Sequence, residues 1–155
     1  MKVKTVLVID DNKRTRDSLK MFFEQENFIV RCCADMTSAC DGLRQVYFDL
    51  VLIDYHLQEM NGAEITRMMR NFCQEPLIVG MSLENKEREF LEAGANAFIG
   101  KDRLIQGLTS LIDDWSERVK NDTVMPAKRL WTNGPQNRSL DHESVTRNIM
   151  NDTKP

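Results

Sequence analysis

No segment of the 155-residue sequence carries an apolar run that approaches the roughly 20 residues a helix needs to cross a bilayer. The amino-terminal residues Met1 to Lys4 lead at once into a predicted strand, so nothing at this end resembles a signal peptide. We therefore expect no membrane insertion and a cytoplasmic location.

Cysteine is scarce, and its spacing matches no metal-binding motif. The four cysteines lie inside predicted strands or helices: Cys32, Cys33, Cys40 and Cys73. Cysteine is among the most buried residue types, and disulfides are rare in cytosolic proteins. We therefore expect buried, reduced thiols at these positions.

The sequence also lacks a strong excess of charge, since its formal net charge is −3. Residues 1–119 hold 15 Lys/Arg and 20 Asp/Glu, whereas residues 120–155 hold 6 and 4. An acidic domain does not favour broad binding to nucleic acid, and the positive balance of the last segment is small. Direct DNA binding is therefore not expected.

What the sequence does contain is an ordinary share of apolar residues, 41%, with 29% charged residues. This composition is typical of a soluble globular protein. A chain of 155 residues is long enough for one domain with a real core and some chain left over.

Short apolar runs alternate with segments of helical periodicity up to about residue 119. The predicted strands are residues 6–9, 28–32, 50–54, 77–81 and 97–100. The predicted helices are residues 13–26, 36–47, the segment after Gly62, 85–93 and 103–119. This alternation predicts an α/β fold with a doubly wound, five-stranded parallel sheet and helices on both faces.

Periodicity also predicts which side chains of two helices face the sheet. Helix 36–47 is expected to direct four residues inward, namely Cys40, Leu43, Val46 and Tyr47. The helix after Gly62 has an apolar stripe at i, i+3, i+4 and i+7, formed by Ile65, Met68, Met69 and Phe72.

Polar residues follow four of the predicted strands directly. These residues are Asp10 and Asp11, Asp54, Ser82 and Lys101. Parallel strands end at a common edge of the sheet, where open α/β folds place their ligands. Three carboxylates at one edge repel one another, and Mg²⁺ is the natural ion to neutralise them.

A carboxylate that is loaded with Mg²⁺ and lies beside a lysine and a hydroxyl suits the acceptance of a phosphoryl group. Phosphoryl transfer requires in-line positioning and neutralisation of the charge on the phosphoryl oxygens. On this interpretation Asp54 is the nucleophile that forms an aspartyl phosphate.

The ordered set of strand-end residues resembles the receiver domain of bacterial two-component response regulators, which has a flavodoxin-like (CheY-like) fold. The matching residues lie between positions 3 and about 119, and they are Asp10, Asp11, Asp54, Met60-Asn61-Gly62, Ser82, Phe98 and Lys101. The resemblance implies that Mg²⁺ binds to Asp11, Asp54 and the main-chain carbonyl of His56, with Asp10 acting through a water. It also implies that Lys101 and Ser82 bind the phosphoryl oxygens.

The resemblance further implies a switch. When Asp54 is phosphorylated, Ser82 moves toward it, Phe98 turns inward, and the face formed by residues 85–119 changes its affinity for a protein partner. The expected phosphoryl donor is a histidine kinase or a histidine phosphotransfer protein. Apart from its own phosphorylation and autodephosphorylation, the protein is not expected to be an enzyme.

Three positions near Asp54 bear on how fast the site would gain or lose a phosphoryl group. His56 and Glu84 stand where the family tunes dephosphorylation, although a plain surface histidine is an equally good interpretation of His56. Leu83 stands where a small residue is usual, and we hypothesise that it narrows access to Asp54. The separation of Ser82 from Lys101, 19 residues, is short by nearly one helical turn and predicts a non-standard partner surface or a gap that the tail fills.

Residues 120–155 are polar and predict a mostly irregular extension, with one weak helix at about 139–151. Two interpretations stay open: a solvated tail, or a docking segment anchored by Leu130 and Trp131. The segment is too short for a DNA-binding output domain, so the sequence predicts a stand-alone receiver. The alternatives are a structural or adaptor receiver that acts without phosphorylation, and a Mg²⁺-dependent phosphatase, which usually has a second acid where this sequence has His56.

Overall fold

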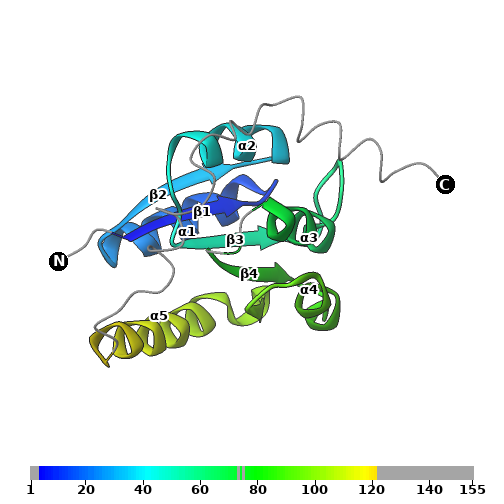
Figure 1. The fold of residues 1–155 in the computed structure, drawn as a ribbon. Helices are drawn as coiled ribbons and strands as arrows, with labels where there is room; N and C mark the ends of the chain where they lie inside the picture. Colours follow the sequence, from blue (N-terminus) through cyan, green and yellow to red (C-terminus); the bar gives the residue numbers. More distant parts are fainter. Residues whose placement is uncertain (1–3, 73, 75, 122–155) are drawn as a thin grey trace.

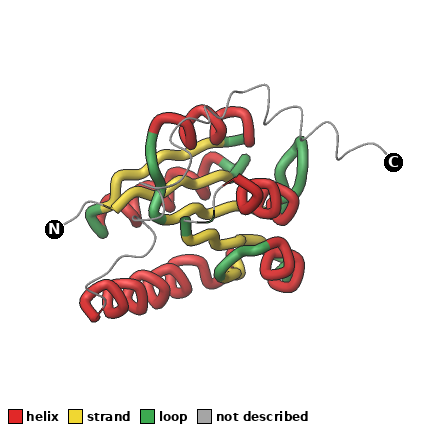
Figure 2. Tube along the Cα trace, viewed as in Figure 1, coloured by secondary structure: helices red, strands yellow, loops and turns green. Residues whose placement is uncertain are grey.

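The computed structural model describes residues 4–72, 74 and 76–121, which form a five-stranded parallel sheet with helices on both faces (Figures 1 and 2). The strands are β1 (Lys4–Ile9), β2 (Phe28–Cys33), β3 (Leu50–Asp54), β4 (Leu77–Ser82) and β5 (Ala97–Gly100). The helices are α1 (Lys13–Gln25), α2 (Met36–Gln45), α3 (Gly62–Phe72), α4 (Glu87–Ala93), α5 (Leu104–Asn121) and a short 3₁₀ turn, η1 (Lys101–Arg103).

The strand order is β2-β1-β3-β4-β5, which confirms the predicted doubly wound sheet. The central strand, β3, is buried along its whole length because helices cover both of its faces. One apolar core lies between the sheet and helices α1 and α5, and the other lies between the sheet and helices α2, α3 and α4. The order and direction of the strands place the ends of β1, β3, β4 and β5 at one edge.

Helix α1 begins where the sequence predicted it. The side chain of Asn12 accepts a hydrogen bond from the backbone N–H of Thr15, which caps the first turn. Leu19 and Phe23 are buried against the sheet. The cap therefore sets the start of the helix immediately after Asp10 and Asp11.

Helix α2 ends earlier than predicted, and the expected inward orientation of Val46 and Tyr47 is wrong. The helix stops at Gln45, and Val46 has extended backbone angles. Val46 is 40% exposed and Tyr47 is 62% exposed. Once the chain leaves the helix, the 3.6-residue period no longer directs these side chains at the sheet.

The stripe on α3 is confirmed for most of its length. Ile65 and Met69 are buried, and Met68 packs against the same core. Phe72, the last residue of the helix, is 40% exposed instead of facing the core. The stripe therefore buries the helix up to its final turn only.

The thiols of Cys32, Cys33 and Cys40 are free, as expected. Cys33 is buried, whereas Cys32 and Cys40 are half-buried, and burial raises the pKa of all three. These thiols are therefore protonated and weakly nucleophilic at neutral pH. Cys73 lies outside the described residues.

Helix α4 has seven residues, which confirms the shortened element between Ser82 and Lys101. Its fully buried Phe90 occupies the space above Gly62 and Gly80, where neither glycine leaves room for a Cβ atom. The helix ends at Gly94, whose φ of 105° lies in the left-handed region that glycine favours.

Helix α5 continues to Asn121, two residues beyond its predicted end. Leu108 and Ile112 are buried, and Leu104, Leu111 and Trp115 pack beside them. Within residues 4–121, no helix combines the length and the apolar character that a membrane span requires. The predicted helix at 139–151 and the proposed anchors Leu130 and Trp131 lie outside the described residues.

Candidate functional site

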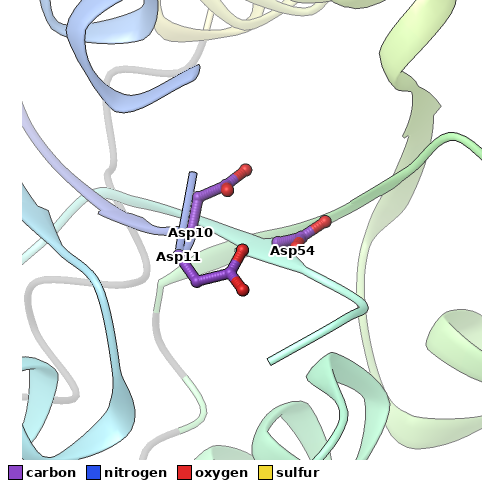
Figure 3. Close-up of side chains that lie close together, drawn as sticks. All are labelled: Asp10, Asp11 and Asp54. Atoms are coloured by element: carbon purple, nitrogen blue, oxygen red, sulfur yellow. The ribbon is translucent and has the colours of Figure 1, made fainter. Parts of the chain in front are cut away.

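Three carboxylates meet at the carboxyl edge of the sheet, and we call Asp10, Asp11 and Asp54 the acid cluster. Ile9 and Ile53 are paired in neighbouring strands, so the residues that follow them emerge side by side. One oxygen from each carboxylate lies within 4.8 Å of the others. Figure 3 shows the three side chains extending from the ends of β1 and β3 into a common space.

Lys101 supplies the positive charge of the site. It follows β5 and opens the η1 turn, at the same edge of the sheet as the acid cluster. Its Nζ lies 2.8 Å from Asp10 Oδ2 and 2.9 Å from Asp54 Oδ1. The lysine side chain is only 15% exposed, so both ion pairs are poorly solvated.

Burial and neighbouring charges shift the pKa values of both Asp54 and Lys101. Burial raises the pKa of Asp54, and the nearby charges of Asp10 and Asp11 add to this effect, while Lys101 partly offsets it. Burial acts against the charge of Lys101, but its hydrogen bonds and ion pairs with Asp10 and Asp54 outweigh that and raise its pKa. The lysine therefore stays charged at neutral pH, and it favours the ionised form of Asp54.

The residues present fit a divalent cation. Asp10 Oδ2 is fully buried, and its close polar partner among the described residues is the Lys101 ammonium at 2.8 Å. One ammonium against three carboxylates leaves negative charge that a small hard cation would neutralise. Asp10, Asp11 and Asp54 are the side chains that would hold such an ion.

Backbone and side-chain hydrogen bonds hold the loop that follows Asp54 at the end of β3. The Tyr55 N–H donates to the Met81 carbonyl at 2.9 Å, and the Gly62 N–H donates to the Tyr55 carbonyl at 2.8 Å. Asn61 and Glu64 cap α3 reciprocally, with side chain to backbone distances of 2.9 Å in both directions. The Met60-Asn61-Gly62 motif therefore sets the start of α3 and closes the loop that carries His56.

The two proposed switch residues lie on the neighbouring strands β4 and β5. Ser82 is fully buried, and its Oγ accepts a hydrogen bond from the Glu84 N–H at 3.2 Å. No hydrogen bond within the described residues joins Ser82 to the acid cluster. Phe98 is half-buried, and its ring centroid lies 5.9 Å from that of Phe90.

His56 and Glu84, which lie far apart in the sequence, form a pair at the rim of the site. His56 Nε2 lies 3.2 Å from Glu84 Oε1, and both side chains are well exposed. Lys86 lies 3.5 Å from Glu84 Oε2 and 4.7 Å from the centre of the Tyr55 ring. These contacts join the loop after β3 to the loop after β4.

Leu83 is largely exposed to solvent. Its side chain is 80% exposed, so it packs against little of the protein. This exposure does not support the hypothesis that Leu83 narrows access to Asp54. A strand-end loop can direct a leucine outward, and the sequence alone does not reveal that direction.

The sequence analysis missed one residue of the site, Arg16. Its Nη1 donates to the Asp10 carbonyl at 2.8 Å and to the Asp11 carbonyl at 3.0 Å. An arginine on a predicted solvent-facing helix position carries no signal of such a contact. Its spacing of five and six residues from the two carbonyls is the only indication that the sequence offers.

The chain is similar to known signalling proteins over most of its described length. The family model described as "Response regulator receiver domain" matches residues 6–113. The chain is 36% identical over 104 residues to the autoinducer 2 sensor kinase/phosphatase LuxQ of Vibrio vulnificus and 30% identical over 98 residues to the transcriptional regulatory protein SrrA of Staphylococcus aureus. Each match covers 62% of this chain, but only 12% of LuxQ and 41% of SrrA.

A solved structure shares the fold. The response regulator receiver domain protein (CheY-like) from Methanospirillum hungatei superposes with a TM-score of 0.69 at 25% identity. The superposition covers 78% of this chain and 100% of the other. Since the chain spans less than half of the curated relatives, the likeness concerns one domain of those proteins.

Proposed function

Because this chain belongs to the response regulator receiver domain family, we propose that it is a phosphorylation switch of a two-component or phosphorelay system. The observation that carries the proposal is Lys101, which lies within 3 Å of both Asp10 and Asp54 beside a third carboxylate. Asp54 is the phosphoryl acceptor in this proposal.

The chemistry follows from the positions of these groups. An oxygen of the ionised Asp54 attacks the phosphorus of a phosphohistidine, the new P–O bond forms, and the P–N bond breaks. The imidazole leaves with the bonding electron pair and takes up a proton. Lys101 pairs with a phosphoryl oxygen, since its ammonium already lies between two carboxylates at the acceptor.

Mg²⁺ is the proposed cofactor, held by Asp11, Asp54 and the His56 main-chain carbonyl, with Asp10 acting through a water. When bound, it neutralises the negative charge that gathers between the carboxylates and the incoming phosphoryl group. The negative balance of the acid cluster supports this assignment.

The output of the proposed switch is a change at the face of α4, β5 and α5. Ser82 turns its hydroxyl from the Glu84 N–H to a phosphoryl oxygen, and Phe98 moves into the space that this opens. The half-burial of Phe98 supports the idea that its ring has two positions. The partner that reads this face is a protein, and the phosphoryl donor is a histidine kinase or phosphotransfer protein.

The proposed location is the cytoplasm. The free thiols of Cys32, Cys33 and Cys40 are compatible with a reducing compartment. The similarity to a sensor kinase and to a transcriptional regulator supports a role in signalling. The proposal includes no direct binding of DNA by this domain.

One experiment tests the acceptor. Wild type, Asp54→Asn and a control, Asp41→Asn, are incubated with acetyl phosphate and Mg²⁺, and the intact masses are measured. Asp41 is an exposed carboxylate on α2, away from the strand ends. One phosphoryl adduct on wild type and Asp41→Asn, absent from Asp54→Asn, supports the proposal, and its absence from wild type overturns it.

The alternative is a receiver that acts as a structural or adaptor protein without phosphorylation. The observation that favours it is the seven-residue α4, which gives the output face an unusual shape. Absence of the adduct together with constitutive partner binding would support this alternative. Rapid multiple turnover on small phosphomonoesters would instead indicate a phosphatase.

A further inference from the structure

Arg16 binds the main chain of the acid cluster. Its Nη1 donates one hydrogen bond to the Asp10 carbonyl at 2.8 Å and another to the Asp11 carbonyl at 3.0 Å. A terminal guanidinium nitrogen carries two N–H groups, so a single nitrogen can serve both acceptors. The side chain of Arg16 therefore folds back toward the start of its own helix.

These two carbonyls have no partner in the regular structure. The pairing of β1 with both of its neighbours ends at Ile9. The Asp10 N–H still donates a hydrogen bond to the Cys33 carbonyl. At the start of helix α1, the Arg16 N–H donates to the Asn12 carbonyl. The carbonyls of Asp10 and Asp11 lie between strand and helix, and Arg16 satisfies both of them.

The arginine does not neutralise the carboxylates directly. None of the ion pairs in the described part of the chain includes Arg16. In contrast, Lys13 on the same helix forms an ion pair with Asp17 at 2.6 Å. The Asp10 carboxylate instead accepts a hydrogen bond from the Asn12 N–H on Oδ1, at 2.8 Å, and pairs with Lys101 through Oδ2.

The orientation of Asp11 depends on its main chain. Among the described residues, no hydrogen bond or ion pair holds the Asp11 carboxylate itself, and the residue is exposed. A hydrogen bond to a carbonyl limits the rotation of the peptide plane, and with it the direction of the side chains on both sides. Arg16 makes this contact on two successive peptides.

We propose that Arg16 is a positioning residue that holds the Asp10 and Asp11 peptides so that both carboxylates face Asp54 in the geometry that binds Mg²⁺. It touches neither the ion nor the phosphoryl group. This inference rests on the proposed function, since it assumes that the acid cluster binds Mg²⁺. Arg16 would thus belong to the site although it lies on α1 and not at the end of a strand.

The test measures Mg²⁺ binding by calorimetry, with no phosphoryl donor present. The variants are Arg16→Met, which keeps a long unbranched side chain but removes all donors, and the milder Arg16→Gln. The control is Arg14→Met, because Arg14 is exposed in the same helical turn and forms no hydrogen bond or ion pair within the described residues. Like Arg16→Met, the control Arg14→Met removes one positive charge from the amino-terminal end of α1.

We expect the dissociation constant for Mg²⁺ to rise about tenfold or more in Arg16→Met, as is common when a group that orients metal ligands is removed. Arg14→Met should stay within about twofold of wild type, since surface substitutions have small effects. In a second measurement with acetyl phosphate, the Mg²⁺ concentration for half-maximal phosphorylation should rise, while the rate at saturating Mg²⁺ changes little.

Equal Mg²⁺ affinity in Arg16→Met and wild type would overturn the inference, as would an equal loss in Arg14→Met. If Arg16→Met does not fold, as judged by circular dichroism, Arg16→Gln decides by the same criteria. If neither folds, Arg16 supports the fold and not the site, and the inference fails. A wild type that binds Mg²⁺ but accepts no phosphoryl group would overturn the proposed function alone.

Discussion

At the level of single residues, the site holds charged side chains that are largely buried. Asp54 is 3% exposed and Asp10 is fully buried, so both carboxylates have lost most of their hydration. Lys101 compensates for part of this loss through two short ion pairs. A buried charge that lacks full compensation costs stability, and this cost supports the proposal that the site binds a cation.

The raised pKa of Asp54 predicts how stability depends on pH. Burial raises this pKa above its ordinary value of 3.8, so the folded state holds the Asp54 proton more tightly than the unfolded chain does. Stability due to this group is therefore present below 3.8 and falls as the pH rises through the raised pKa. At neutral pH without Mg²⁺, Asp54→Asn should unfold at a higher urea concentration than wild type.

This advantage of Asp54→Asn should shrink as the pH is lowered toward 3.8, which urea titrations at several pH values would measure. Asp41→Asn is the control, because it removes an exposed carboxylate on α2 outside the acid cluster. A variant that is no more stable than wild type at pH 7 would contradict the prediction.

The exposure of Leu83 predicts that its size has no effect on entry to the site. Leu83→Ala should phosphorylate with acetyl phosphate at a rate within about twofold of wild type, since the side chain is 80% exposed. The measurement is the time course of the intact-mass adduct. A severalfold faster rate in Leu83→Ala would restore the idea that this leucine limits access.

Among the helices and strands, α4 is short and is stabilised by tertiary contacts. Isolated helices of fewer than about 12 residues are marginal in water, so this seven-residue helix depends on tertiary contacts. Phe90 anchors its middle against the sheet. Arg70 binds its carboxyl end, donating to the Gly94 carbonyl at 2.8 Å and to Asn96 Oδ1 at 2.6 Å.

The contact between Phe90 and Gly80 predicts a paired effect. A Cβ atom on residue 80 would overlap the Phe90 ring, so Gly80→Ala should lower the free energy of unfolding by about 1–3 kcal/mol. Phe90→Leu alone should also destabilise, because it leaves a cavity.

The double variant, Gly80→Ala with Phe90→Leu, should be less destabilised than the sum of the two single variants. Urea titrations of all four proteins complete the cycle. Additive losses would show that the ring and residue 80 do not share this space.

For the molecule as a whole, Mg²⁺ should stabilise the fold, because the proposed ion site joins the ends of β1 and β3, which are distant in the sequence. A ligand that binds only the folded state adds about 2.7 kcal/mol when its concentration is 100 times its dissociation constant. The unfolding temperature of wild type should therefore rise with added Mg²⁺ and fall again with a chelator.

The matched comparison for the metal effect is Asp11→Asn, which removes an exposed carboxylate of the acid cluster with little change to the core. Its unfolding temperature should respond much less to Mg²⁺ in a thermal scan. An equal response in this variant would place the ion elsewhere on the molecule.

Much of the architecture was predictable because its signals are local. Apolar runs of strand length and helical periodicity identified the five strands and five helices, including the start of α1 at residue 13. The order of the strand-end residues also predicted that Asp10, Asp11, Asp54 and Lys101 would lie together, since parallel strands share a carboxyl edge. Their chemical roles stay predictions.

The fold class and the set of side chains that gather at one edge of the sheet thus follow from the order of residues along the chain. The three-dimensional arrangement was needed for the exposure of Val46, Tyr47 and Leu83, the position of Phe90 above Gly80, and the hydrogen bonds of Arg16. This division arises because a repeating pattern specifies which face of an element is apolar. Where the element stops, and which distant group fills a space or satisfies a carbonyl, depends on contacts between residues remote in the chain.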